Sequence, residues 1–334
     1  MSAAKEIKRR DKNAKIIIYE TAPHLGGRCR SFFDEKLGIN IDNATHAIVG
    51  ANKNASKFLM KKSFKRDVYF FDYKGKNLKK TSWRDAEDIA LAVFNQPLKN
   101  VPKKMIWKVL WKMFPFFKAK VSVWFSGGDL SEKFIKPLEK YVDEIRFGWC
   151  LSDFKAENSK INCLIFGKQT VEINENNFVV SAMDAKNFVK IFGGEEFEFE
   201  SIINIVYRTS MKITLPKNLD FMGVKNGLVQ WVSVTNDALS VTISAANDIT
   251  ISNEELALIV WKEVCEIRGR EAAFVPAYRV MKYPNATIKQ DTRNNNLRTV
   301  NAKSKYKNLS MVGDWTVKDF PCSIEAAMIS GKKV

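Results

Sequence analysis

Short apolar runs, separated by charged or glycine-containing turns, dominate this chain and predict alternating strands and helices. Near the start, the apolar run Ile16–Tyr19 ends in Glu20, a pattern typical of a buried parallel strand. The charged segment Lys8–Lys15 before it predicts the end of a helix, whose first turn would be residues 1–4. Similar patterns predict strands at 144–147, 162–166, 178–182 and 308–312, and the strand at 162–166 is expected to form a hairpin with 168–172.

In the remaining sequence, some segments space their apolar residues as a helix does, and others alternate apolar and polar residues as a strand does. Residues 83–125 favour mainly helical structure, and residues 130–141 place their apolar side chains on one helix face. A further helix is predicted at 254–267. Between 197 and 246, apolar and polar residues alternate, which indicates an antiparallel sheet that would form the floor of a substrate chamber.

The two ends of the chain carry three parts of a flavin-binding pattern. Glu20, at the end of its strand, is placed to accept hydrogen bonds from an adenosine ribose, and the turn Gly26–Arg28 follows it. Near the other end, Gly313–Asp314 precede a helix that is predicted to begin at Ser323. Because a helix N-terminus favours a pyrophosphate or other anion, a bound FAD is the first hypothesis.

Simpler interpretations of these residues remain open. Gly26 and Gly27 alone are more often a turn than a cofactor site, although the preceding strand and Glu20 favour the cofactor. Asp314 can also serve as a helix cap. The combination of Gly313, Asp314 and the turn at Ser323 favours cofactor contact.

One part of the dinucleotide-binding unit is missing from the sequence. A G-x-G-x-x-G loop should precede the first helix, whereas the chain begins with Met1–Ala4. We therefore expect the first strand and the phosphate-binding loop to be absent from this polypeptide. A misplaced start, a shortened polypeptide and gene decay all remain open as explanations.

These segments resemble a known family of flavoenzymes. The resemblance rests on Tyr19–Phe32 and Gly38–His46, resumes at 128–131, 230–232 and 244–246, and is strongest over 308–331. The chain is similar there to the squalene-associated FAD-dependent desaturases, or hydroxysqualene dehydroxylases, of the flavin-containing amine oxidase superfamily. Between about 96 and 127, a helical stretch of that family is shortened here.

The resemblance implies a role for individual residues in holding FAD. Glu20 would bind the ribose, Arg28 would lie near the phosphate and the flavin, and Asp314 would lie near the pyrophosphate and ribityl chain. The backbone of Ile324–Ala326 would face the flavin pyrimidine ring, where a helix N-terminus stabilises the negative charge of the reduced flavin. The cofactor-binding residues implied in this way are Glu20, Gly26, Gly27, Arg28, Leu151, Gly313, Asp314, Ser323, Ile324, Glu325 and Ala326.

Two residues are candidates for catalysis. The resemblance places the segment of Asp42 and His46 under the isoalloxazine ring, where a protonated imidazole could assist departure of a hydroxyl group as water. Alternatively, His46 is hydrogen-bonded to the backbone and orients the loop, and Asp42 is the competing acid. Ala44 replaces the glycine that is usual in the family after Asp-Asn.

The implied reaction is the reductive dehydroxylation of hydroxysqualene, a long isoprenoid, to squalene in hopanoid biosynthesis. The resemblance makes NADPH a plausible electron donor, although the sequence contains no separate nicotinamide motif. A carotenoid-type desaturase or amine oxidase is one alternative function. The other is a truncated homologue without flavin or activity. Enzymes of the squalene pathway are further expected partners.

The fold class implied is α/β. We expect an FAD-binding Rossmann-like domain, truncated at its N-terminus, with an interleaved α+β substrate domain that contains an antiparallel sheet. The expected division gives FAD-binding parts at 1–75, 128–190 and 286–334, a helical substrate or membrane-facing region at 76–127, and a substrate domain at 191–285.

Composition favours a large enzyme of the cytoplasm. The 334 residues include 46% hydrophobic residues, enough for a substantial core, and no apolar run approaches the roughly 20 residues of a spanning helix. The charged start does not resemble a signal peptide. The five cysteines have no metal-binding spacing and are expected to be reduced thiols, so no metal is expected.

The excess of basic residues is a second indication of what the protein binds. The chain has 54 Lys and Arg against 37 Asp and Glu, a net charge of +17. Residues 103–118 interleave lysines with tryptophan and phenylalanine, a pattern that suits peripheral contact with anionic lipid on the inner face of the cytoplasmic membrane. An ordinary core helix with extended lysines is equally open. Because no nucleic-acid-binding module is recognisable, we expect no nucleic-acid partner.

Overall fold

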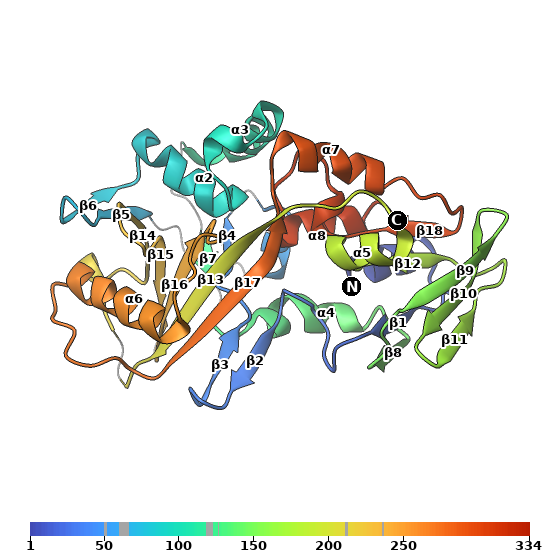
Figure 1. The fold of residues 1–334 in the computed structure, drawn as a ribbon, viewed down its shortest axis with the longest axis horizontal. Helices are drawn as coiled ribbons and strands as arrows, with labels where there is room; N and C mark the ends of the chain where they lie inside the picture. Colours follow the sequence, from blue (N-terminus) through green and yellow to red (C-terminus); the bar gives the residue numbers. More distant parts are fainter. Residues whose placement is uncertain (50–51, 60–66, 118–122, 126, 211–212, 236) are drawn as a thin grey trace.

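The computed structural model describes residues 1–49, 52–59, 67–117, 123–125, 127–210, 213–235 and 237–334. A seven-stranded sheet and helix α6 (Asn253–Ile267) form one side of the molecule, and short parallel strands with several helices form the other (Figure 1). The long strands β13 (Phe199–Arg208) and β17 (Tyr278–Ile288) extend from the first region toward the second.

The large sheet is antiparallel apart from one pair of strands. β14 and β5 run parallel, which joins a strand from the first quarter of the chain to the sheet. The predicted antiparallel sheet is therefore confirmed, and it extends beyond the predicted range at both ends. Its order is β17, β13, β16 (Ala238–Ser244), β15 (Trp231–Val234), β14 (Phe221–Lys225), β5 (Tyr69–Asp72) and β6 (Asn77–Lys80).

Helix α6 supplies much of the core beside this sheet. Its residues Leu256, Val260 and Val264 are fully buried in one apolar cluster with strand residues of the sheet. The Ser252 Oγ accepts a hydrogen bond of 3.0 Å from the Glu255 amide, which satisfies one of the free donors at the helix start. The predicted helix at 254–267 is confirmed.

The second region contains two pairs of parallel strands. β1 (Ile17–Glu20) pairs with β8 (Glu144–Phe147), and β12 (Val179–Ser181) pairs with β18 (Leu309–Met311). All four strands were predicted from the sequence. The helices of this region include α1 (Ser2–Arg10), α5 (Ala185–Phe192), α7 (Thr292–Asn301) and α8 (Ile324–Gly331).

Short antiparallel pairs complete this part of the fold. The predicted hairpin is confirmed by β10 and β11, and β9 adds a third strand to it. These elements are β9 (Asp153–Glu157), β10 (Lys160–Phe166), β11 (Gln169–Glu172), β2 (Ser31–Asp34) paired with β3 (Ile39–Asp42), and β4 (Ala47–Val49) paired with β7 (Val123–Phe125).

The mainly helical prediction for 83–125 is confirmed for α2 (Ala86–Phe94) and α3 (Lys103–Phe117). It is wrong for 123–125, which form β7 because they pair with β4. Residues 118–122 lie outside the described residues. No helix in the described ranges is both long enough and apolar enough to cross a bilayer.

The predicted single helix at 130–141 is shorter and irregular. A π-helical turn over Ser131–Ile135 precedes α4 (Lys136–Glu139), which has Pro137 in its first turn. Proline has no N–H to donate to the preceding turn, so the change of hydrogen-bond register just before it has a local cause.

The expected domain division stays a prediction. β5 lies within the range 1–75 yet pairs with β14, whereas β17 ends at Ile288, three residues beyond the expected substrate domain. β17 therefore crosses an expected boundary, and the pairing of β5 with β14 joins two of the expected parts.

A buried arginine fastens the last segment of the chain to α7. Arg298 is fully buried, and its Nη1 donates hydrogen bonds of 2.7 Å to the carbonyl oxygens of both Val317 and Phe320. Nearby, the Asn295 amide donates to Asp319 and its oxygen accepts from the Asp319 backbone. These bonds fix the turn that leads into α8.

Replacing Arg298 by methionine should lower the free energy of unfolding by about 2–4 kcal/mol, because two buried carbonyl oxygens lose their donor. Urea denaturation monitored by circular dichroism measures the change. Arg293→Met on the same helix is the control, since that side chain is 52% exposed. Equal stability of the two variants would contradict the proposed role of Arg298.

Candidate cofactor site

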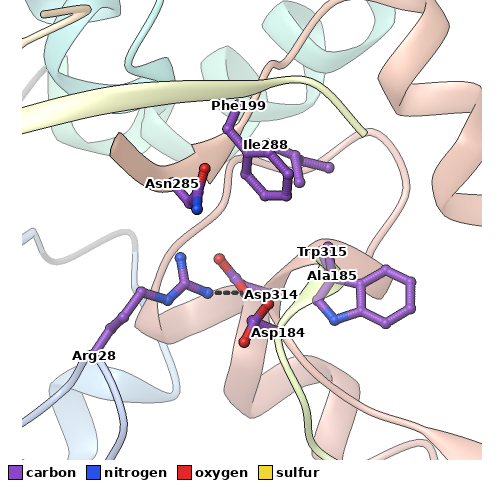
Figure 2. A pocket seen from close by; sticks show the side chains of 8 residues that line it. All are labelled: Arg28, Asp184, Ala185, Phe199, Asn285, Ile288, Asp314 and Trp315. Atoms are coloured by element: carbon purple, nitrogen blue, oxygen red, sulfur yellow. Dashed lines mark hydrogen bonds and ion pairs between the residues drawn. The ribbon is translucent and has the colours of Figure 1, made fainter. Parts of the chain in front are cut away.

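Three charged side chains gather where parallel strands end. Arg28 follows β1, Asp184 follows β12, and Asp314 follows β18. Figure 2 shows Arg28 extending from its loop toward the two aspartates. In α/β folds, ligands bind beyond the carboxyl ends of the strands, so this is the edge where a cofactor is expected.

An ion pair connects the first and last parts of this site. The Arg28 Nη2 lies 2.7 Å from the Asp314 Oδ1, and Arg28 also donates to the Ala286 carbonyl oxygen. Asp314 is buried while Arg28 remains about half exposed. The negative charge of Asp314 raises the pKa of Arg28 above its ordinary value. Arg28 is therefore a permanent cation that neutralises Asp314.

The site surrounds a small hollow with about 220 Å³ of empty space that opens to solvent. Phe199, Ile288 and Trp315 form its apolar side, and Trp315 is held by a 3.0 Å hydrogen bond from Nε1 to the Met183 carbonyl oxygen. The hollow is narrow and open to solvent, so its charged lining, rather than its volume, makes it a candidate site.

Glycine is required at the loop that presents Arg28. Gly26 has a φ of +102°, and a Cβ there would lie 2.4 Å from the Cys29 carbonyl oxygen. Gly27 also adopts a positive φ of +56°. At the other end of the chain, Gly313 has a φ of +148°. The predicted glycine turns thus have a conformational cause that is independent of any cofactor.

The start of α8 is built as predicted around Ser323. Its Oγ accepts a hydrogen bond of 3.2 Å from the Ala326 amide. The amides of Ile324 and Glu325, in the first turn, have no acceptor within the helix. The Glu325 carboxylate is buried and accepts hydrogen bonds from the Asn54 and Ala55 amides, both 2.9 Å, and from the Asn54 side chain. That side chain connects α8 to the segment after β4.

Glu20 is the last residue of β1, and Leu151 packs beside that strand. The Glu20 Oε1 accepts a 2.9 Å hydrogen bond from the Ala22 amide, so it stabilises the turn after the strand. Leu151 is partly buried in an apolar cluster with Tyr19 and Trp149. Their predicted contacts with ribose and adenine stay predictions.

Asp42 holds the loop after residue 127 to β3. Its buried carboxylate accepts hydrogen bonds from the Ser31 hydroxyl at 2.6 Å and from the amides of Gly128 and Leu130 at 2.8 and 3.1 Å. Three donors occupy this carboxylate, which gives it a structural role that the sequence alone did not indicate.

His46 lies in the loop that follows Asp42. Its Nδ1 is 2.7 Å from the Ala44 carbonyl oxygen; since a carbonyl only accepts, Nδ1 carries the proton. Burial lowers the pKa of His46, although the Ala44 hydrogen bond and Asp42 oppose this effect. The positive charge of Arg28 also lowers the pKa of His46. A neutral ring bonded to the backbone matches the structural alternative, and the catalytic role stays a prediction.

Several residues of the site were missed in the sequence. Asp184 follows a predicted strand and caps α5 by accepting a 3.0 Å hydrogen bond from the Asn187 amide, so the strand–Asp–helix pattern was its signal. Asn285 lines the hollow from β17, and Phe199 does so from β13. No local signal marks these two, because pairing of the long strands brings them there.

The donor set is compatible with FAD. A fixed cation, two carboxylates and first-turn helix amides can bind phosphate, hydroxyl and ring oxygen groups of a dinucleotide. Arg28, Asp314 and α8 come from the two ends of the chain, as the sequence predicted, whereas Asp184 comes from its middle.

Comparison with known sequences supports this assignment. The family profile of the NAD(P)-binding Rossmann-like domain matches residues 1–61. The chain is 24% identical to the hydroxysqualene dehydroxylase of Zymomonas mobilis, over 95% of this chain and 92% of the relative. It is 22% identical to that of Sinorhizobium fredii over 95% and 91%. The chain thus resembles hydroxysqualene dehydroxylases over nearly its full length.

Solved structures show the same fold at low sequence identity. An oxidoreductase from Methanosarcina mazei aligns with a TM-score of 0.70 at 12% identity, covering 99% of this chain and 96% of that chain. Cyclohexylamine oxidase from Brevibacterium oxydans aligns with a TM-score of 0.68 at 11% identity, covering 99% and 94%. The predicted fold class is therefore confirmed, and the named relatives and structures are enzymes.

Asp42→Asn should lower the free energy of unfolding by about 1–3 kcal/mol, because an amide group then faces backbone N–H donors. Urea denaturation measures this change, and Asp248→Asn at an exposed position is the control. A variant that keeps full stability and loses only turnover would instead favour the predicted catalytic role of Asp42.

NMR titration should give His46 a pKa below the ordinary value of about 6.5. The unfolded chain then binds a proton before the folded chain does, so this group lowers stability as the pH falls below about 6.5. The chain has two histidines, and His46→Gln identifies the signal by removing it. A titration midpoint above 6.5 would contradict the effect of burial.

Proposed function

We propose that this chain is an FAD-dependent oxidoreductase that acts on a long isoprenoid, and that its reaction is the reductive dehydroxylation of hydroxysqualene to squalene. The observation that carries the proposal is the similarity to hydroxysqualene dehydroxylases over 95% of the chain, which includes both segments of the site. The meeting of Arg28 and Asp314 at the carboxyl ends of parallel strands supports it.

Reduced FAD, when bound, would supply the hydride that replaces the hydroxyl group. In this proposal Arg28 binds a phosphate oxygen while it neutralises Asp314, and Asp314 accepts hydrogen bonds from cofactor hydroxyl groups. The first-turn amides of α8 stabilise negative charge on the flavin ring. Glu20 binds the ribose.

The proton needed by the leaving hydroxyl group is assigned to the segment of Asp42 and His46. The Nδ1 proton of His46 is already donated to Ala44, so a proton for the substrate would leave from Nε2 after the ring is protonated. Because burial opposes that protonation, turnover should rise as the pH falls if His46 is the acid. NADPH as the source of electrons and pathway enzymes as partners remain part of the proposal.

The alignment with the first relative covers 388 positions, whereas this chain has 334 residues. The relatives therefore carry segments without a counterpart here. This difference is compatible with the shortened stretch expected near 96–127 and bears directly on how the substrate would be enclosed.

Purified protein that is incubated with FAD and separated from the excess should retain flavin absorption, and anaerobic incubation of the reduced form with hydroxysqualene should yield squalene. Asp314→Asn should weaken FAD binding about 10- to 100-fold, because a charged acceptor is lost. Absorption titration measures the affinity, with Asp248→Asn as the control.

The other outcomes distinguish the alternatives. Bleaching of oxidised flavin by an amine or a carotenoid precursor would favour an oxidase or desaturase. Protein that retains no flavin would favour the homologue without cofactor and would contradict the proposal for this polypeptide.

A further inference from the structure

Helix α3 divides into a packed face and an exposed face. Met105, Ile106 and Val109 belong to an apolar cluster that includes Ala90 and Phe94 of α2. The opposite face exposes large apolar side chains: Trp107 is 63% exposed, Trp111 76% and Leu110 40%. Figure 1 shows α3 at the outer edge of the molecule beside α2.

Lysines surround these exposed side chains. Trp107 and Trp111 are four residues apart and therefore neighbours on the helix surface, with Lys103, Lys104 and Lys108 exposed around them. Lys104 and Lys108 share a single acidic partner, since their Nζ atoms lie 3.3 and 3.1 Å from the same Asp319 oxygen. Three lysines against one carboxylate leave this face positive.

We propose that the exposed face of α3, formed by Lys103, Lys104, Trp107, Lys108, Leu110 and Trp111, binds the surface of an anionic lipid bilayer. The tryptophans enter the headgroup region, where an indole can bury its ring and keep its N–H hydrated. The lysines contact lipid phosphates. The 15-residue helix lies along the surface, as amphipathic interfacial helices do.

Charge favours this occupant over a second copy of the chain. In a symmetric dimer the same patch meets itself, which would bring the lysines of two copies together. The net charge of +17 adds long-range attraction to an anionic surface. The surface belongs to α3 and is independent of the reaction proposed above, so each can fail without the other.

Co-sedimentation with vesicles tests the proposal. The full chain should bind vesicles of equimolar phosphatidylcholine and phosphatidylglycerol, and binding to phosphatidylcholine alone should be at least about tenfold weaker. W107A/W111A should weaken binding to the anionic vesicles about tenfold or more, whereas W107F/W111F should retain most of it. K103E should weaken it about five- to 30-fold, and added salt should do the same.

The control variant is F274A/L258A, which removes two side chains that are 74% and 55% exposed elsewhere. It should bind vesicles as the unchanged chain does, and circular dichroism should show that all variants remain folded. Vesicle binding that is absent, independent of lipid charge, or unchanged in W107A/W111A would overturn the proposal. So would sedimentation showing that W107A/W111A converts a dimer to a monomer, or capture of an acidic protein in place of lipid.

Discussion

The candidate site depends on the meeting of the two ends of the chain. Arg28 and Asp314, 286 positions apart, form an ion pair in which one partner is buried. A buried carboxylate without a partner would be costly, so the pair requires that both loops lie together. The same ends meet again where Glu325 accepts hydrogen bonds from Asn54 and Ala55, and where the Ser2 hydroxyl donates to the Met328 carbonyl oxygen.

Two of these connections use residues that the proposed cofactor would also contact. Arg28 neutralises Asp314 but stays half exposed, so its remaining donors can bind an anion. The Glu325 side chain points into the protein to hold Asn54, while the first-turn amide of the same residue lies at the open end of α8. In Glu325, the structural and binding roles are thus divided between the side chain and the backbone.

The polar groups of the Asp42 and His46 segment are extensively hydrogen-bonded. Asp42 accepts from three donors, and His46 gives its Nδ1 proton to Ala44. Such bonds define the loop conformation, and a proton transfer there would have to disturb them. Farther from the site, one face of α3 packs against α2, as expected of a core helix, and the opposite face exposes Trp107 and Trp111.

Local pattern was sufficient to predict β1, β8, β12, β18 and the antiparallel sheet, because alternation and apolar runs reflect burial of a single strand. It also identified Arg28 and Asp314, whose glycine turns are visible in the sequence. Tertiary structure alone placed β5 beside β14 and brought Asn285 into the site. These positions follow from pairing between strands far apart in the chain, and no short sequence window contains both partners of such a pair.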